Sequence, residues 1–401
     1  MKIGILTFHR SINYGAFMQC YSLATRLRKD FPQHTVEVID YNSSVMEGVY
    51  EAQIQKAPPQ LAQKLSRRME AFHSVYHALP LSERRMVGDS CQELAQWLNE
   101  EYDAVIVGSD AVWNWILRGF PNPYFLKDYK GLKLSYAASA HGQRFRNMTA
   151  EQKAYLQEAF QDFYYLGVRD SNTEDMLQYV SPQLQGHHNC DPTIFLDPRS
   201  IPCDMEALKE KLRQRGVDFT KPLVGIMGYP TRIGKELKRK LGSEVQLIAL
   251  YEENRYADVY LHDLTPFEWA RVFSLFTATV THFFHGTLLS LVNGTPVFSV
   301  ETGSAFALEY TTKIQDALWR MGLQQQRYMD SGGKRNFLQK VCNKLGITVD
   351  RALWNEICGE IREIINGKDL GIGPRVQQEA RSYEDFRSAL EQGLKSRKSS
   401  K

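Results

Sequence analysis

The sequence predicts an α/β protein made of two parallel-sheet domains and a helical C-terminal extension. The chain has 401 residues, and because a single hydrophobic core stops growing near ~250–300 residues, two domains are expected. Apolar runs of strand length alternate with amphipathic helical stretches along most of the chain, which is typical of strand–helix–strand units. The Pro-rich segment Asp197–Pro202 interrupts this alternation and is the best linker candidate. We therefore predict two Rossmann-like domains that face each other across a cleft.

The predicted domain boundaries follow from this linker. Residues 1–198 form the first domain, residues 203–370 the second, and residues 371–401 a C-terminal helix with a basic tail. Within the first domain, residues 44–90 form a helical excursion, because Pro58-Pro59 breaks the alternation and an amphipathic stripe follows it. Basic residues surround this stripe. Most such faces are merely solvated, and the alternative is contact with an acidic acceptor or a membrane surface.

Composition narrows the class of protein. The formal net charge of +3 is small for a chain of this size, so we expect no nucleic-acid partner. No run approaches the ~18 apolar residues of a membrane-spanning helix, and Met1–Phe8 has the pattern of a strand rather than of a signal peptide. The six cysteines are scattered and form no Cys-x-x-Cys pair, as expected of reduced thiols. We expect a cytoplasmic protein, and the basic excursion leaves open a peripheral position on the inner face of a membrane.

The first predicted strand, Lys2–Phe8, leads into a candidate ligand-binding loop. The loop contains Asn13-Tyr14-Gly15 and is followed by a helix with apolar residues at helical spacing. A glycine at this place lets the backbone approach a ligand closely, although the Gly-x-Gly-x-x-Gly pattern of dinucleotide-binding loops is absent. A plain tight turn would have the same sequence, so both interpretations stand.

Two later strands of the first domain end in polar residues. The strand from Tyr102 ends in Gly-Ser-Asp110, and Trp113 follows shortly after it. This combination suits a sugar, because sugars stack on aromatic rings and bond their hydroxyls to carboxylates. The alternative is a capping aspartate and a buried tryptophan. Another strand reaches Arg169, which is expected to face the cleft or to pair with the adjacent Asp170.

The stretch Thr279–Glu301 is the centre of the second domain. A β-rich run enters Phe284-His285-Gly286-Thr287, a short apolar helix follows, and Pro296–Val300 is the next strand. His285 is thereby expected between the carboxyl end of a strand and the amino terminus of a helix, where backbone N–H groups favour an anion. A histidine there can bind a phosphate or carboxylate and donate a proton. The alternative is a histidine that caps a helix in a packed turn.

Lys313 stands at the start of the next predicted helix. A lysine in a first helical turn opposes the helix dipole and so favours a nearby anion, although an exposed lysine is the commoner outcome. The segment His187–Thr193 contains residue types that bind metals, but their spacing matches no metal site. We therefore predict no metal.

Taken together, these motifs resemble the polysaccharide pyruvyl transferase family, from Met1 to about Gly322. Phe283 departs from the pattern, since many members carry Arg or Ser there, and Ala16 stands where many carry Asp. The family's fold is similar to the two-domain GT-B architecture, which agrees with the two domains predicted above. The matching pieces, in chain order, are Lys2–Thr7 with Asn13–Ala16, Val107–Asn114, Val168–Asp170, Asp191–Thr193, Phe284–Thr287, and Lys313 before Leu318.

The resemblance implies transfer of the enolpyruvyl skeleton from phosphoenolpyruvate to two hydroxyls of one sugar, which forms a cyclic pyruvate ketal and releases phosphate. Arg169 suits a bidentate grip on the donor's carboxylate, and Lys313 is a point charge for its phosphate. No cofactor is required, because phosphoenolpyruvate is itself the donor. The candidate residues are His285 and Asp110 for catalysis, Arg169, Lys313, Gly286 and Thr287 for the donor, and Asn13, Tyr14, Gly15 and Trp113 for the acceptor.

Two other functions stay open from the sequence. A GT-B glycosyltransferase that uses a nucleotide sugar would explain the fold and a cationic site for a diphosphate. A non-catalytic relative that keeps only sugar binding would explain the departures at Phe283 and Ala16. For the transferase, the expected acceptor is an oligosaccharide or lipid-linked sugar of a cell-surface polysaccharide. The sequence gives neither the identity of that sugar, nor the position and stereochemistry of the ketal, nor the oligomeric state.

Overall fold

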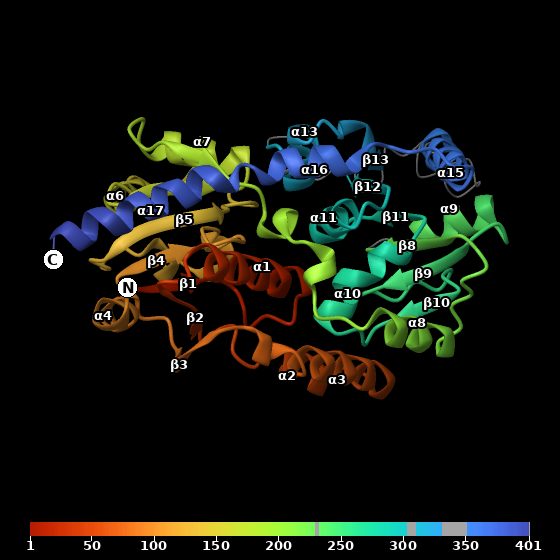
Figure 1. Ribbon diagram of the computed structural model, residues 1–401, viewed down its shortest axis with the longest axis horizontal. Helices are drawn as coiled ribbons and strands as arrows, with labels where there is room; N and C mark the ends of the chain where they lie inside the picture. The colour runs from red at the N-terminus through yellow and green to blue at the C-terminus, as the bar shows by residue number, and fades with distance from the viewer. Residues whose placement is uncertain (229–231, 303–309, 331–350, 401) are drawn as a thin grey trace. The chain divides into compact units, whose positions relative to one another are not determined.

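The chain folds into two compact α/β units, each with one parallel sheet (Figure 1). The computed structural model describes residues 1–228, 232–302, 310–330 and 351–400. Each unit collects segments that are distant in sequence. Unit 1 contains Met1–Ala62, His73–Phe195 and Glu379–Lys401, and unit 2 contains Gln63–Phe72 and Leu196–Gln378.

Unit 1 is built on a seven-stranded sheet with the order β3-β2-β1-β4-β5-β6-β7, in which all neighbouring strands are parallel. Every residue of β4 and β6 is buried, as expected for a parallel sheet covered on both faces. The strands are β1 (Lys2–Leu6), β2 (Thr35–Asn42), β3 (Leu81–Val87), β4 (Ala104–Val107), β5 (Leu132–Ala138), β6 (Tyr165–Val168) and β7 (Gly186–His188).

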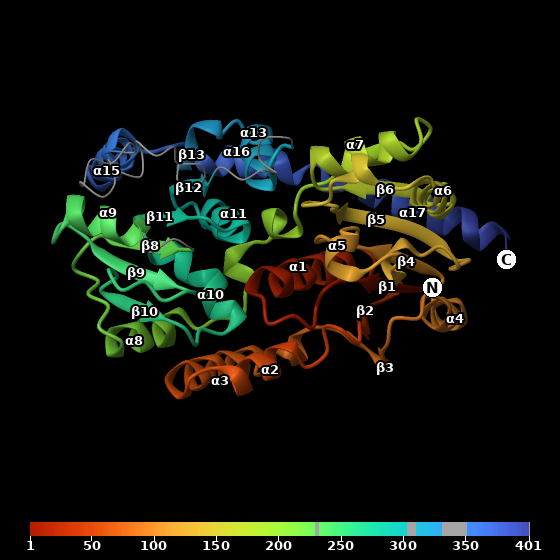
Figure 2. The ribbon, with the colours of Figure 1, turned by 180° about the vertical axis from the view of Figure 1, so that it is seen from behind.

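The helices of unit 1 come from both ends of the chain. The C-terminal helix α17 lies along β5 and β6, which both views show (Figures 1 and 2). Gly393 permits this close approach, because a Cβ there would lie 2.9 Å from Cδ2 of Leu132. The helices are α1 (Tyr14–Asp30), α2 (Val49–Lys56), α3 (Pro59–His73, shared with unit 2), α4 (Cys91–Glu101), α5 (Trp115–Arg118), α6 (Ala150–Phe160), α7 (Ser171–Val180) and α17 (Tyr383–Ser400), with 3₁₀ turns at Tyr76–Ala78, Pro123–Phe125, Phe145–Asn147 and Pro192–Phe195.

Unit 2 has a six-stranded parallel sheet with the order β10-β9-β8-β11-β12-β13. Trp354, Ile357 and Ile361 of α15 are fully buried against its strands. The elements are α8 (Met205–Gln214), β8 (Leu223–Met227), α9 (Arg232–Leu241), β9 (Gln246–Leu250), β10 (Val259–Leu261), α10 (Pro266–Val272), β11 (Ala278–Thr281), α11 (Phe284–Val292), β12 (Val297–Thr302), α13 (Lys313–Arg320), β13 (Arg327–Asp330), α15 (Arg351–Ile365) and α16 (Ile372–Ala380), with 3₁₀ turns at Pro198–Ser200, Phe273–Leu275 and Gln324–Gln326.

The two sheets share one strand order. In each unit the order reverses beside the first strand, between β1 and β4 in unit 1 and between β8 and β11 in unit 2. Open parallel sheets bind ligands at the carboxyl ends of their strands, at such a reversal. Asp110 follows β4 and His285 follows β11, so the two predicted catalytic residues lie at the reversals of their respective sheets.

The excursion over residues 44–90 differs from the helical segment that the sequence predicts. It contains α2 and α3, but it ends in the edge strand β3, which the sequence analysis missed. Its sequence, LSERRMV, carries charges at the exposed positions of an edge strand rather than a continuous apolar run. Moreover, Gln63–Phe72 of α3 belongs to unit 2, with Arg68 and Phe72 as its buried residues.

The C-terminal part also departs from the prediction. The one helix predicted within residues 371–401 is two helices, α16 and α17. Ser382 lies between them, and its Oγ accepts the N–H of Cys190 at 2.8 Å. The basic tail at the end of the chain is helical to Ser400. The strand β13 was not predicted. The pattern over Phe337–Leu345 predicts a further helix, and this segment lies outside the described residues.

Candidate active site

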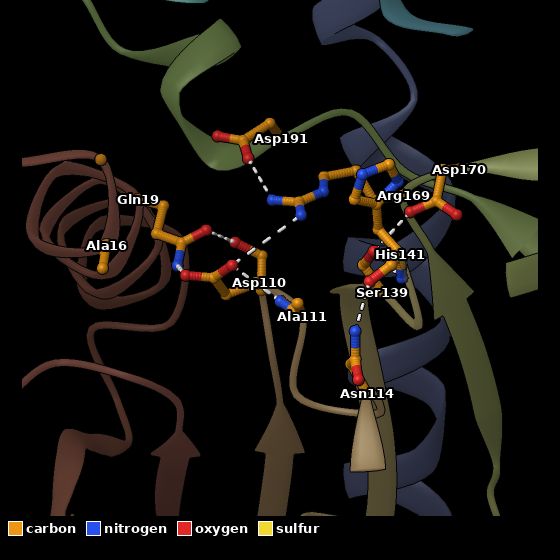
Figure 3. A network of polar contacts seen from close by, with 12 residues as sticks. Ala16, Gln19, Asp110, Ala111, Asn114, Ser139, His141, Arg169, Asp170 and Asp191 are labelled. Atoms are coloured by element: carbon orange, nitrogen blue, oxygen red, sulfur yellow. Dashed lines mark hydrogen bonds and ion pairs between the residues drawn. The ribbon is translucent and has the colours of Figure 1, made fainter. Parts of the chain in front are cut away.

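In unit 1, Asp110 lies just past β4 with its carboxylate held at both oxygens. Oδ1 accepts the N–H of Ala111 at 2.7 Å, and Oδ2 accepts Nε2 of Gln19 at 2.9 Å (Figure 3). The φ of Asp110 is 95°, a backbone conformation that directs the residue out of the strand. Its side chain remains 18% exposed, so this carboxylate is fixed in place and still reaches the surface.

Arg169 follows β6, and its guanidinium links two carboxylates. Nη1 donates to Oδ2 of Asp191 at 2.9 Å, and Nη2 lies 3.9 Å from Oδ1 of Asp110. Asp191 is held in turn by Thr193, whose N–H and hydroxyl both donate to Oδ1. The structure therefore brings Arg169 and Asp110, which the sequence analysis singled out separately, into one network (Figure 3).

Arg169 keeps its charge although its side chain is almost completely buried. Burial alone would lower the pKa of Arg169, but the charges of Asp191, Asp110 and Asp170 outweigh it and raise the pKa. Asp170, the neighbour proposed as a direct partner, caps α7 by accepting the N–H of Thr173 at 3.0 Å. The sequence pattern Ser171-x-x-Glu174 is typical of a helix cap at Ser171, but Ser171 is instead the first residue of the helix.

The Asn13-Tyr14-Gly15 motif builds the start of α1. Oδ1 of Asn13 accepts the N–H of Gly15 at 2.9 Å and the N–H of Ala16 at 3.2 Å, which is a regular N-cap. Asn13 is exposed, whereas Tyr14 and Gly15 are buried. Capping explains the motif without a ligand, and an acceptor-binding role for its exposed residue stays a prediction.

Trp113 belongs to the core of unit 1. Its side chain is fully buried, and its ring centroid lies 4.7 Å from that of Phe160. Its indole N–H donates to the carbonyl oxygen of Tyr124 at 3.2 Å. This arrangement matches the buried-tryptophan alternative, so any effect of Trp113 on an acceptor would act through the loop that it supports.

The sequence analysis missed Gln19, which is fully buried on α1 and contacts Asp110 directly. The available signal was a polar residue among the apolar positions of a helix, close to Phe17 and Leu23. A second missed contact joins neighbouring loops, because Nδ2 of Asn114 donates to the carbonyl oxygen of His141 at 2.6 Å. Both contacts lie in the network of Figure 3.

In unit 2, the residues predicted to form a turn are the first turn of a helix. β11 ends at Thr281, Phe283 is the N-cap of α11, and Phe284 is the first helical residue. The side chain of Phe283 makes no capping hydrogen bond. His285, the second residue of α11, is half-buried. It lies where the first N–H groups of a helix favour an anion, as the sequence predicts.

Lys313 lies on another helix, and its side chain reaches the Phe284 ring at the start of α11. It is the first residue of α13, which Thr312 caps. Its Nζ lies 5.1 Å from the centroid of the Phe284 ring, and the ring centroid of His285 lies 5.2 Å from that of Phe284. The structure thus brings His285 and Lys313 to one phenyl ring at the amino terminus of α11.

Gly286 and Thr287 hold α11 against the sheet. A Cβ on Gly286 would lie 2.5 Å from Oγ1 of Thr281 and 3.1 Å from Sδ of Met227, so the position requires a glycine. Thr287 is buried, and its hydroxyl shares a 2.8 Å hydrogen bond with Oγ of Ser299. The N–H of Thr287 donates to the carbonyl oxygen of Phe283 at 3.0 Å, so a ligand at this helix start would meet the N–H of Gly286 and not that of Thr287.

Arg68 of α3 is a buried residue that the sequence analysis counted among solvated basic positions. Its Nε donates to the carbonyl oxygen of His262 at 3.3 Å, and Nη2 donates to that of Tyr251. Its guanidinium carbon lies 4.5 Å from the centroid of the Tyr251 ring. That ring meets Phe283 edge-on at 5.6 Å, so Arg68 supports the N-cap of α11 through one tyrosine.

Three further features of the described residues concern metal sites, membrane spans and cysteines. In residues 1–228, 232–302, 310–330 and 351–400, no group of three or more His, Cys, Asp and Glu side chains is arranged to hold a metal ion. Over the same ranges, no helix combines the length and the apolar character needed to cross a membrane. The cysteines that the structure describes there are free thiols: Cys20, Cys91, Cys190, Cys203 and Cys358.

Comparison with solved structures concerns the class of fold. UDP-GlcNAc 2-epimerase from Methanocaldococcus jannaschii is 10% identical with a TM-score of 0.50, over 88% of this chain and 93% of that chain. UDP-GlcNAc 2-epimerase from Neisseria meningitidis bound to UDP-GlcNAc is 10% identical with a TM-score of 0.49, over 96% and 100%. ADP-heptose LPS heptosyltransferase II from E. coli is 12% identical with a TM-score of 0.38, over 90% and 99%. The likeness concerns the fold alone, which is GT-B-like.

The family follows from the sequence comparison. The family model described as polysaccharide pyruvyl transferase matches residues 13–304, and this chain belongs to that family. The matched segment includes Asp110, Arg169 and His285, while Lys313 lies just beyond it. A search of curated proteins finds no match.

Proposed function

We propose that this protein transfers the pyruvyl group of phosphoenolpyruvate to a sugar of a cell-surface polysaccharide, or of its precursor, to form a pyruvate ketal. Membership of the pyruvyl transferase family supports this reaction class. The observation that carries the proposal is the joint position of His285 and Lys313 at the start of α11. Phosphoenolpyruvate is a small, highly charged anion, and this is a place where a fold favours one.

Unit 2 binds the phosphate of the donor in this proposal. Lys313 supplies a positive charge, and the N–H of Gly286 supplies a directed donor at the helix start. Thr287, also predicted to bind the donor, is assigned a supporting role, because its N–H donates to the carbonyl oxygen of Phe283 at 3.0 Å. Hydrogen bonds to a charged acceptor are about twice as strong as neutral ones. Arg169 is assigned the carboxylate of the donor, because a guanidinium forms two parallel hydrogen bonds to a carboxylate.

The reaction requires one new C–H bond and two new C–O bonds. His285 donates a proton to the methylene carbon of phosphoenolpyruvate, which makes C2 oxocarbenium-like, and a sugar hydroxyl attacks C2. A second hydroxyl of the same sugar then attacks C2, and the bond from C2 to the phosphate oxygen breaks with its electron pair on the phosphate. Of the two hydroxyl protons, one replaces the proton spent by His285 and the other leaves on the phosphate.

Asp110 is assigned the proton of the first attacking hydroxyl, which it then passes to the departing phosphate, while the proton of the second hydroxyl returns to His285. A carboxylate that is fixed by hydrogen bonds and still reaches the surface is suited to accept a proton from a bound substrate. Its place beyond β4, at the reversal of strand order, is where a parallel sheet presents groups to a ligand.

The acceptor is an oligosaccharide or a lipid-linked sugar in this proposal. Asn13, Tyr14 and Gly15 are assigned to it, with Trp113 supporting the adjacent loop. Within the excursion, Val45, Leu61 and Val87 are exposed apolar residues among basic ones. These favour a peripheral contact with the inner face of a membrane, where a lipid-linked acceptor would lie.

The test measures phosphate release from phosphoenolpyruvate by the full chain. Methyl glucoside, methyl galactoside and methyl mannoside serve as acceptors, since each carries the free hydroxyl pairs that a ketal needs. We expect release to depend on an acceptor and to fall in the His285→Ala variant. No release with any acceptor would refute the proposal, whereas equal rates in both proteins would remove His285 from the mechanism. A nucleotide-sugar transferase would instead be stabilised against heat by a nucleoside diphosphate and not by phosphoenolpyruvate.

A further inference from the structure

We infer that Gln19 is a positioning residue of this reaction, which holds the Asp110 carboxylate in the orientation that accepts the hydroxyl proton. The inference rests on the proposed function, because it acts through the role assigned to Asp110. Gln19 lies one turn inside α1 and is fully buried. Its amide joins two residues that follow β4 (Figure 3).

The orientation of the Gln19 amide is determined by its two partners. The hydroxyl of Ser109 donates to Oε1, and the carbonyl oxygen of Ser109 is itself fixed by the hydroxyl of Thr7 at 2.7 Å. Nε2 then faces Oδ2 of Asp110 at 2.9 Å. The flipped amide would set a carbonyl oxygen against an ionised carboxylate, with an acceptor on each side and no hydrogen between them. Gln19 is therefore a donor to Asp110.

This contact restrains the second oxygen of the carboxylate. The N–H of Ala111 and the guanidinium of Arg169 both face Oδ1, whereas Gln19 holds Oδ2. Two oxygens held from different elements fix the plane of the carboxylate, and the direction of its remaining lone pairs is fixed with it. A proton acceptor needs that direction, because misplacement by about 1 Å can cost ~10²-fold in rate.

Packing alone does not require an amide at this position. A methionine has nearly the same length and shape, fills a helix face adaptably and carries no strong hydrogen-bonding group. A buried amide, by contrast, costs free energy unless both of its ends are bonded. The polar network is thus the feature that distinguishes Gln19 from an apolar residue, and Gln19→Met removes the network while it keeps the volume.

The experiment compares kcat and the KM for phosphoenolpyruvate, with the methyl glycoside that gives the highest wild-type rate. The variants are Gln19→Met, Gln19→Glu, Asp110→Asn and Gln19→Met combined with Asp110→Asn. Ser22→Ala is the matched control, because Ser22 is also buried on α1 and its hydroxyl bonds only within the helix, to the carbonyl oxygen of Met18. Melting temperatures are recorded for all of them.

We expect Gln19→Met to lower kcat by ~10–100-fold with KM for phosphoenolpyruvate changed less than about twofold. Gln19→Glu is expected to be worse, because it sets a carboxylate against a carboxylate. In the Asp110→Asn background, Gln19→Met should cause no further loss, since both changes then affect the same group. Ser22→Ala should keep wild-type kcat.

Three outcomes would overturn the inference. Wild-type kcat in Gln19→Met, beside an impaired Asp110→Asn, would remove Gln19 alone and leave the proposed function standing. Independent, additive losses in the double variant would show that Gln19 acts through packing rather than through Asp110. Absence of wild-type phosphate release would overturn the proposed function and, with it, the inference.

Discussion

The two units share a strand order but differ in the partners of the buried cations at the carboxyl ends of their strands. In unit 1, the buried guanidinium of Arg169 is paired with Asp191 and lies close to Asp110. In unit 2, the buried guanidinium of Arg68 donates to two backbone carbonyl groups and lies over the ring of Tyr251. The edge formed by the carboxyl ends of the unit 1 strands is therefore organised around carboxylates. The corresponding edge of the unit 2 sheet is organised around cations that carbonyl groups and aromatic rings hold.

One carboxyl group of unit 2 lies near two basic residues. Burial raises the pKa of Glu252, although His282 and Arg68 oppose it, so this group takes up a proton at a higher pH than an exposed carboxyl group does. The carboxylates of unit 1 fit the sugar that we propose as acceptor, because its hydroxyl loses a proton. The cations of unit 2 fit the phosphate of phosphoenolpyruvate, and Arg169 of unit 1 is assigned the carboxylate of that donor.

The largest effect is expected at His285. His285→Ala should lower kcat by ~10²–10⁴-fold, the usual contribution of a general acid, as measured by phosphate release. His77→Ala, at an exposed histidine of unit 1, is the control for loss of an imidazole. A decrease in kcat of less than ~10-fold would mean that unit 2 does not supply the proton. The assignment of proton donation to unit 2 would then be wrong.

The carboxylates of unit 1 are tested by stability. Asp191→Ala should lower the free energy of unfolding by ~3–5 kcal/mol, because it leaves the Arg169 charge buried without its closest carboxylate. Urea denaturation measures the change. The matched control is Glu210→Ala, which breaks the ion pair of Glu210 with Arg213. The side chains of Arg213 and Glu210 are 51% and 57% exposed, so this change should lower the free energy of unfolding by under ~1 kcal/mol. Equal effects of the two variants would show that the unit 1 network is not a buried one.

Lys313 tests the anion-binding role of unit 2. Lys313→Ala should raise KM for phosphoenolpyruvate by ~10–100-fold, since a hydrogen bond to a charged group contributes ~1.5–3 kcal/mol. Lys313→Arg should recover part of the loss. Lys235→Ala, which removes an exposed lysine from α9 of the same unit, is the control. An unchanged KM in Lys313→Ala would separate this lysine from the donor.

A substitution at Gly286 tests the packing of α11 against the sheet. Gly286→Ala should destabilise the protein by ~1–3 kcal/mol, because its Cβ would lie 2.5 Å from Oγ1 of Thr281 and overpacking forces the helix to shift. The melting temperature and kcat should both decrease, since the same helix carries His285. Gly359→Ala is the control, because no atom lies within 4 Å of its Cβ and alanine favours the helix.

The sequence was sufficient for features that depend on local pattern. Apolar runs predicted the strands β1, β4 and β12, and strand-end motifs placed Asp110 just past β4 and His285 between β11 and the start of α11. It failed where the pattern is weak. β3 and β13 were missed because edge strands tolerate charged residues, and their pairing partners are distant in sequence.

Burial of individual polar and aromatic residues was the other failure, because it is decided by tertiary packing. Trp113 has the sequence context of a sugar platform, yet it is enclosed by Phe160 and Phe163. Arg68 has the context of a solvated helix face, yet α3 packs it into unit 2. No local period distinguishes these outcomes, since each depends on segments that approach from elsewhere in the chain.

The smallest predicted effect concerns His262, beside Arg68 at the cationic edge of unit 2. Burial, helped by Arg215, Lys64 and Arg68, lowers the pKa of His262, and Asp263 only partly opposes this. The unfolded chain then binds more protons than the folded one between the lowered pKa and the ordinary value near ~6.5, so stability should decline as pH falls through this window.

His262→Gln should flatten this decline, as followed by urea denaturation between about pH 7.5 and 5, and His77→Gln should leave it unchanged. An identical slope in His262→Gln and wild type would contradict this prediction. It would mean that His262 takes up its proton equally well in the folded and in the unfolded chain, so that neither its burial nor the cations around it lower its pKa.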